Sequence, residues 1–149
     1  MGEQKLATRS CQIEMQLATG EMLQGEIFLQ LVGAHGLDGQ RLDELLNSED
    51  CFLPIRNEGG VTLVNLRQVA SISIPDDQEN NSMMKLGERH LVSVKTSVGA
   101  PFEAEVYVNL PSNRTRVKDF LNQKLRFLPF FAGDQVVYLN FRYILQVKD

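Results

Sequence analysis

Arginines paired with asparagines are the residues of this sequence best suited to bind a ligand. Arg41 lies shortly before Asn47, and Asn65 lies two positions before Arg67. A planar guanidinium donates paired hydrogen bonds to a carboxylate or a phosphate, so these pairs could hold an anionic ligand. The alternative, which we favour, is that they maintain turns, where asparagine is common for conformational reasons. The same pairs recur later in the chain, as Arg116 with Asn122 and as Asn140 with Arg142.

Two aromatic residues lie on the polar side of expected strands and could anchor a protein partner. Phe28 is flanked by Glu26 and Gln30, and Tyr107 occupies the same kind of position later in the chain. Either these rings contact a partner, or a helix or another part of the same chain covers them. Neither alternative is favoured by the sequence.

Basic residues gather late in a chain that is acidic as a whole. The formal net charge is −4 at pH 7, which argues against a general nucleic-acid binder. The cluster could contact RNA or an acidic protein, but it lacks the interleaved aromatic residues on which single-stranded bases stack. We favour a solvated helix face instead. The cluster consists of Arg114, Arg116, Lys118, Lys124 and Arg126.

The sequence contains no recognisable motif for catalysis, metal binding or cofactor binding. It has no glycine-rich phosphate loop and no Gly-x-Ser-x-Gly nucleophile elbow. Cys11 and Cys51 are the only cysteines, and no Cys/His cluster accompanies His35 and His90. A zinc or iron site would need more soft ligands than these. We therefore expect a protein that is not an enzyme, needs no metal or cofactor, and keeps both thiols free.

Internal self-similarity is the strongest pattern in the sequence. Residues 12–31 align without a gap with residues 91–110, and residues 41–74 align without a gap with residues 116–149. The first block matches a glycine turn between two alternating apolar runs. The second block matches Phe-Leu-Pro with Phe-Leu-Pro and Asn-x-Arg with Asn-x-Arg. Because self-similarity at a fixed spacing marks repeat architectures, we interpret the chain as two copies of one unit.

Apolar periodicity predicts the elements of one unit. Residues 13–17 and 23–31 alternate between apolar and polar on either side of a glycine turn, which is typical of a β-hairpin. A short helix should follow, because Leu42, Leu45 and Leu46 share one stripe. Short strands separated by turns complete the unit. The expected order is β-β-α-β-β, and a fifth strand after the Asn-x-Arg bend is left open.

Turn residues and polar stretches set the expected boundaries. Asn47 and Asn122 lie where the two helices should end, and asparagine tolerates the left-handed backbone that is used there. The polar stretch PDDQENNSMMKLGER is typical of a linker. We expect an N-terminal tail over residues 1–10, a first repeat over 11–74, a linker over 75–89 and a second repeat over 90–149.

The expected fold class is mainly β with short helices (α+β). It consists of two tandem β-β-α-β-β repeats that pack with pseudo-two-fold symmetry. Each sheet face that carries the alternating apolar residues should be buried. The residues expected in the core are Ile27, Leu29, Val106 and Val108.

The pattern Arg-x4-Leu-Asn, Phe-Leu-Pro and Asn-x-Arg covers most of both copies. It resembles an uncharacterised bacterial family of tandem small β-rich repeats, and that resemblance implies no activity. The order of strand, glycine turn, strand and late Asn-x-Arg bend is also similar in outline to Sm-like small β-barrels. In those barrels the helix precedes the first strand, whereas here it lies between the second and third strands.

Apolar content and the start of the chain point to a cytoplasmic protein without membrane insertion. No apolar run approaches the roughly 20 residues that span a bilayer, and the start MGEQKLATRSCQ lacks the apolar core of a signal peptide. Our leading hypothesis is a non-enzymatic protein-interaction or scaffold module. It would bind a protein partner or self-associate through strand edges or the Phe28 and Tyr107 faces. The alternative is a ligand- or RNA-binding module that uses the basic residues of the second copy.

Overall fold

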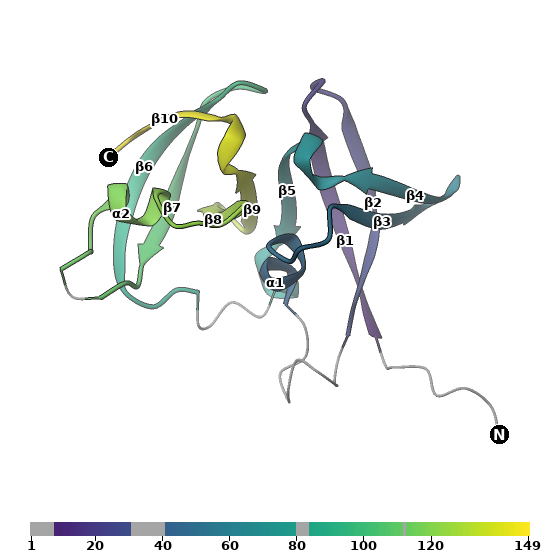
Figure 1. Ribbon diagram of the computed structural model, residues 1–149, viewed down its shortest axis with the longest axis horizontal. Coiled ribbons are helices and arrows are strands. Elements are labelled where there is room, and N and C mark those ends of the chain that lie inside the picture. Colours follow the sequence, from purple (N-terminus) through teal and green to yellow (C-terminus); the bar gives the residue numbers. More distant parts are fainter. Residues whose placement is uncertain (1–7, 31–40, 80–83, 112) are drawn as a thin grey trace.

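The computed structural model describes residues 8–30, 41–79, 84–111 and 113–149. This part of the chain forms one open, antiparallel sheet of ten strands with two short α-helices and three 3-10 turns (Figure 1). The prediction of a mainly β fold with short helices is therefore confirmed. His35 and most of the expected N-terminal tail lie outside the described residues.

The first half of the described chain, residues 8–79, contains the elements expected from its periodicity and a fifth strand. The turn between its first two strands uses Gly20 at a φ of 91°, a conformation that glycine adopts without strain. Its elements are β1 (Thr8–Leu17), β2 (Met22–Gln30), α1 (Leu42–Leu46), β3 (Phe52–Asn57), β4 (Gly60–Asn65), η1 (Leu66–Gln68), β5 (Val69–Pro75) and η2 (Asp76–Gln78).

The second half, residues 84–149, has the same order of strands, helix and 3-10 turn up to its fifth strand. Its first turn uses Gly99 at a φ of 88°, at the position that aligns with Gly20. Its elements are β6 (Glu88–Thr96), β7 (Phe102–Val108), α2 (Val117–Leu121), β8 (Phe127–Ala132), β9 (Gln135–Asn140), η3 (Phe141–Tyr143) and β10 (Ile144–Lys148).

The strand order of the sheet is β10-β6-β7-β8-β9-β5-β1-β2-β3-β4. Each half thus contributes five neighbouring strands, and the antiparallel pair β5–β9 joins the halves. Figure 1 shows β5 between the strands of the first half and those of the second. Both ends of the sheet, β10 and β4, are edge strands.

The expected pseudo-two-fold packing is wrong. A two-fold axis would require two reciprocal contacts, so that β5 meets β9 and β10 meets β4. In the structure β5 pairs with β9, while β10 and β4 lie at opposite ends of the sheet. The halves are therefore joined head to tail. The physical reason is that β9 carries apolar residues on both faces, so one face packs on its own half while the other packs on the first half.

Two apolar clusters form the core. One consists of second-half residues alone, including Val106, Val108 and Phe130. The other contains the first-half residues Ile27 and Leu29 together with four side chains from β8 and β9. The prediction that Ile27, Leu29, Val106 and Val108 are buried is confirmed. The four second-half side chains that enter the first-half cluster are Phe127, Phe131, Val136 and Tyr138.

Candidate functional site

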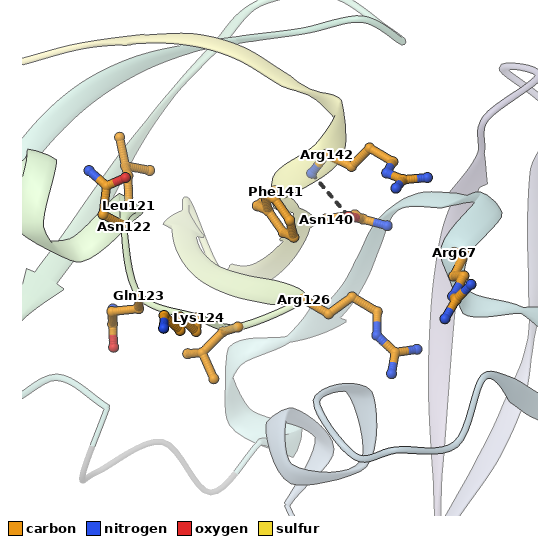
Figure 2. Close-up of a pocket in the computed structure, with 10 residues that line it drawn as sticks. Arg67, Leu121, Asn122, Gln123, Lys124, Arg126, Asn140, Phe141 and Arg142 are labelled. Carbon is orange, nitrogen blue, oxygen red and sulfur yellow. Dashed lines mark hydrogen bonds between the residues drawn. The ribbon is translucent and has the colours of Figure 1, made fainter.

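A cationic pocket with a volume of about 690 Å³ lies beside the junction of the two halves (Figure 2). Arg67 comes from η1, Arg142 comes from η3, and Lys124 and Arg126 come from the segment between α2 and β8. None of the ten described residues that line the pocket is acidic. The pocket therefore concentrates positive charge in a chain whose net charge is negative.

The Asn-x-Arg motif places two of these arginines. Asn140 accepts a hydrogen bond from the Arg142 backbone N–H at 3.1 Å and so caps η3. Asn65 caps η1 in the same way, through the Arg67 backbone N–H at 3.0 Å. These contacts support the structural interpretation of the asparagines, because an Asn side chain satisfies the first free N–H of a short turn.

The arginine side chains of the pocket differ in the hydrogen bonds that they make within the protein. Arg126 donates hydrogen bonds to the backbone oxygens of Ser48 at 2.6 Å and Asp50 at 3.1 Å, which ties the second half to the first. The guanidinium groups of Arg67 and Arg142 form no hydrogen bond or ion pair with any other described residue. These two groups are the ones available to a ligand.

Arg41 and Arg116 lie elsewhere and serve their own helices. Arg41 precedes α1, and its Nε lies 3.1 Å from Asp43 Oδ1 and 3.3 Å from Glu44 Oε1. Arg116 precedes α2, and its Nε lies 3.3 Å from Asp119 Oδ2. Neither lines the cationic pocket, so the structure brings together two of the four expected arginines and leaves the other two as local helix partners.

Asn47 and Asn122 end the helices without the left-handed backbone that we expected. Asn47 has a φ of −104° and Asn122 a φ of −93°. Their side chains act instead, each donating to a backbone oxygen of its own helix. Asn47 also exchanges two hydrogen bonds with the Phe127 backbone, donating at 3.1 Å and accepting at 2.8 Å. Asn47 therefore clamps the two halves together.

The structure separates the two aromatic candidates. Phe28 remains 41% exposed, and its ring contacts the Arg56 guanidinium, whose carbon lies 4.6 Å from the ring centroid. Tyr107 packs edge-on against Phe131 at 5.4 Å and donates a hydrogen bond to Glu105 at 3.0 Å. Phe28 is thus open to a partner, whereas Tyr107 is partly covered by its own half.

An apolar surface at the β4 end of the sheet was not anticipated from the sequence. Phe52, Val61 and Leu63 are 56%, 66% and 65% exposed. Their aligned residues in the second half, Phe127, Val136 and Tyr138, are fully buried. We call Phe52, Val61 and Leu63 the β4 apolar surface. A comparison of aligned positions identifies these residues as a matched apolar set, but it does not show in which half of the chain they are exposed.

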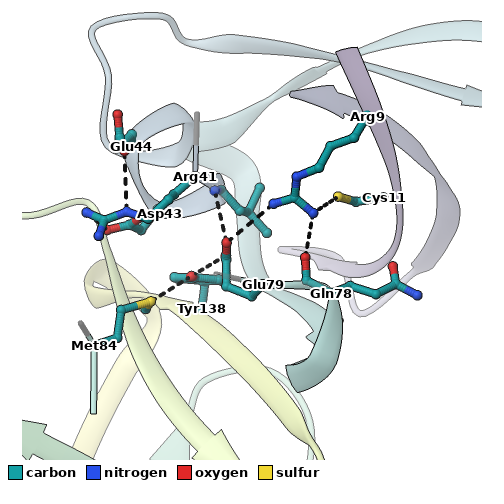
Figure 3. Close-up of polar contacts among 10 residues, drawn as sticks. Arg9, Cys11, Arg41, Asp43, Glu44, Gln78, Glu79, Met84 and Tyr138 are labelled. Atoms are coloured by element: carbon teal, nitrogen blue, oxygen red, sulfur yellow. Dashed lines mark hydrogen bonds and ion pairs between the residues drawn. The ribbon is translucent and has the colours of Figure 1, made fainter. Parts of the chain in front are cut away.

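A buried carboxylate lies at the junction and was also missed. Glu79 accepts hydrogen bonds from the Tyr138 hydroxyl at 2.5 Å and the Leu42 backbone N–H at 3.4 Å, and Arg9 lies 3.9 Å away (Figure 3). Burial raises the pKa of the Glu79 carboxyl above its ordinary value, and the nearby Asp43 raises it further. Burial also raises the pKa of Tyr138, and Glu79 adds to that shift. This contact ties the residue that follows η2 to β9 of the second half.

Cys11 and Cys51 are both free, and burial raises the pKa of the Cys11 thiol, which disfavours the reactive thiolate. Neither described helix is long and apolar enough to cross a membrane.

Comparison with known proteins gives no match to this chain among family models, curated proteins or solved structures. The support for the two candidate sites, the cationic pocket and the β4 apolar surface, therefore comes from their geometry alone.

Proposed function

We propose that this chain is a non-enzymatic protein-interaction module, made of two tandem copies of one small β unit. It binds an extended segment of a partner protein along β4. One observation carries this proposal: the β4 apolar surface is exposed, while the aligned residues of the second half are buried against a neighbouring strand and its half.

The edge of β4 has the features that strand addition requires. Among the described residues β4 pairs with β3 alone, so one side of its backbone is free to bind. An added strand gains affinity from main-chain hydrogen bonds and specificity from alternate side chains. The β4 sequence GVTLVN carries neither a charged residue nor a proline, the two devices that commonly protect an edge strand from pairing.

Burial of the β4 apolar surface would contribute substantially to binding. Covering one large aliphatic side chain stabilises a contact by about 1.5–3 kcal/mol. Val61 and Leu63 alternate along β4, so both side chains lie on one face of the sheet. Phe52 lies on β3 opposite Asn65, beside the same edge. A partner strand that pairs with β4 can cover this face with its own flanking structure.

Selection of peptides from a random display library on the immobilised chain tests the proposal. We expect the selected peptides to alternate apolar residues and to protect the β4 amides from hydrogen exchange. Leu63→Arg should weaken their binding by at least about tenfold, because it removes an apolar contact and adds a charge. Leu91→Arg is the matched control, since Leu91 is also 65% exposed but lies on β6. Peptides whose binding is unaffected by Leu63→Arg would contradict the proposal.

A second candidate function is binding of a small anionic ligand in the cationic pocket. The observation that favours it is the pair of uncommitted guanidiniums, Arg67 and Arg142, in a pocket without acidic lining residues. Guanidinium groups suit carboxylate and phosphate. Calorimetric titration with inorganic pyrophosphate tests it, and Arg67→Ala with Arg142→Ala should abolish the signal. Arg116→Ala, outside the pocket, should retain it. No heat on titrating the unaltered chain would contradict this candidate.

A further inference from the structure

The junction inside the chain uses two surfaces, and the chain carries a second, unused copy of each. The used surfaces are β5 of the first half and β9 of the second half. In the sequence alignment β9 corresponds to β4, and β5 corresponds to β10. Those counterparts are the two edge strands at opposite ends of the sheet. β4 is thus the counterpart of the strand that pairs with β5, and β10 is the counterpart of the strand that pairs with β9. The two free edges should therefore be able to pair with each other as β9 and β5 do.

The backbone pairing of the used junction can be transferred to the edges residue by residue. In the chain, Ser71 pairs with Leu139, Ile72 with Tyr138 and Ser73 with Val137. The aligned residues are Gln146 with Val64, Val147 with Leu63 and Lys148 with Thr62. No proline interrupts either edge strand, so an antiparallel ladder of this register can form.

The asparagine that bridges the used junction has an unused counterpart. The Asn140 amide nitrogen donates across the junction to the backbone oxygens of Val69 at 3.0 Å and Leu66 at 3.4 Å. Asn65 aligns with Asn140 and caps its own 3-10 turn identically, but its amide nitrogen donates to no described residue. The corresponding acceptors are the backbone oxygens of Phe141 and Ile144, beside the β10 edge.

The second clamp of the junction is duplicated too. Asn47 exchanges two hydrogen bonds with the backbone of Phe127. Its counterpart Asn122 has the same position at the end of its helix, and among the described residues its side chain bonds only the Lys118 backbone oxygen, at 2.8 Å. The counterpart of Phe127 is Phe52, at the start of β3 beside the β4 edge. Asn122 and Phe52 thus lie near opposite ends of the sheet. Within one chain they are too far apart to form the contact that Asn47 and Phe127 form.

Residues that are buried at the β5–β9 junction have exposed counterparts on the two edge strands, as expected if the edges are the two sides of an unused junction. On one side, the β4 apolar surface is exposed where Phe127, Val136 and Tyr138 are buried. On the other side, Leu145 of β10 is 59% exposed where the aligned Ala70 of β5 is buried. Both ends of the sheet therefore present apolar side chains where the same junction inside the chain is covered.

We propose that a second copy of this chain is the partner at β4. The β10 edge of one copy pairs with β4 of the next, and the contact reproduces between chains the β5–β9 junction within the chain. This inference rests on the interaction role proposed above for β4. Because β4 and β10 are different surfaces, the contact is heterologous, and association continues past a dimer into a closed ring or an open filament.

Two edge variants test the inference, since each blocks one end of the sheet. Leu63→Arg blocks β4 and Leu145→Arg blocks β10, and both residues are exposed, so neither change disturbs the core. Light scattering after gel filtration at about 100 µM should show assemblies larger than a dimer for the unaltered chain and monomers for each variant. An equimolar mixture of the two variants should form a one-to-one dimer and nothing larger, through the single intact pair of edges. Leu91→Arg should assemble like the unaltered chain.

A third variant tests Asn65, the counterpart of the bridging Asn140, without blocking an edge. Asn65→Asp keeps an oxygen that caps η1 and replaces the amide donor with a charged carboxylate oxygen, which cannot donate to the backbone oxygens of Phe141 and Ile144 and is repelled by them. It should therefore weaken assembly by more than about tenfold while retaining the melting temperature of the monomer. Three results would overturn the inference: a monomeric unaltered chain, a variant that still dimerises alone, or a mixture that stays monomeric. A monomeric chain that still binds display peptides through Leu63 would overturn this inference and leave the proposed function standing. A monomeric chain that also binds no display peptide through Leu63 would overturn both this inference and the proposed function.

Discussion

The Tyr138 hydroxyl donates a 2.5 Å hydrogen bond to the Glu79 carboxylate, and both side chains are buried where the two halves of the sheet meet. Burial raises the pKa of Glu79 more than the contacts with Tyr138, Leu42 and Arg9 lower it. A carboxyl with a raised pKa binds its proton more readily in the folded chain than in the unfolded chain. Its contribution therefore favours folding at low pH and is lost as the pH rises.

Replacement of Glu79 by glutamine should change how stability depends on pH. Glu79→Gln keeps an acceptor for the Tyr138 hydroxyl but cannot ionise. The melting temperature of the variant relative to that of the unaltered chain should therefore rise as the pH increases from the ordinary glutamate pKa of 4.5 through the raised value. Melting curves recorded by circular dichroism across that range measure the difference.

The control for this experiment is Glu21→Gln, because Glu21 is exposed in the turn between β1 and β2. It removes the same charge without affecting the junction. A difference in melting temperature that stays constant with pH for Glu79→Gln, or that matches Glu21→Gln, would show that Glu79 does not titrate as its burial implies.

Asn47→Ala should destabilise the chain by about 1–3 kcal/mol, because the Phe127 backbone loses two partners at a part-buried position. Asn122→Ala is the matched variant, since within the described part of the chain the Asn122 side chain bonds only its own helix. It should cost less than Asn47→Ala. Both variants are made in the Leu63→Arg background, which keeps the chains monomeric. Urea denaturation then measures the difference in their free energies of unfolding. Equal losses of unfolding free energy would contradict the assigned clamp.

The arginines of the cationic pocket should differ in their effect on stability. Arg67→Ala and Arg142→Ala should change the free energy of unfolding by no more than about 0.5 kcal/mol, because both side chains are exposed and uncommitted. Arg126→Ala should cost about 1–3 kcal/mol, because it removes two hydrogen bonds to the first half. Denaturant melts of the three variants compare them. A large loss for Arg142→Ala would mean that its guanidinium is structural.

Val106→Asp should destabilise the second half by at least about 3 kcal/mol, because it places an unpaired charge in a fully buried position. Leu91→Asp introduces the same charge at an exposed position of the neighbouring strand and should be tolerated. Thermal melts distinguish the two. Comparable melting temperatures would mean that the buried face of β7 has been assigned incorrectly.

The strands and helices could be predicted from the sequence because local periodicity specifies them. Ile27 and Val106 lie on the alternating apolar side of their strands, and that side is buried in both halves. The glycine turns at Gly20 and Gly99 also follow from local chemistry, because each uses a positive φ. Asn65 and Asn140 act as turn caps, as the structural alternative held.

The arrangement of the two halves could not be predicted, because it depends on long-range pairing. Val61 and Val136 occupy aligned positions in strands of similar composition, yet one is exposed and the other is buried. Like β9, β4 carries apolar residues on both faces, so this local feature does not specify which of the two edges pairs inside the chain. Glu79 was missed for a related reason: it is one of several acids in a polar stretch that is typical of a linker, and only the folded chain places Tyr138 beside it.

Hydrogen exchange of the β4 amides is the most direct measurement of the central claim that β4 is a free edge that accepts a strand. In dilute solution the peptide that contains Gly60–Asn65 should exchange faster than the one that contains Gln135–Asn140, because β9 is paired on both sides and β4 on one. Raising the protein concentration should slow the exchange of β4 toward that of β9, and Leu145→Arg should prevent this slowing. A β4 segment that exchanges at the same rate at every concentration, with no display peptide able to slow it, would contradict the account.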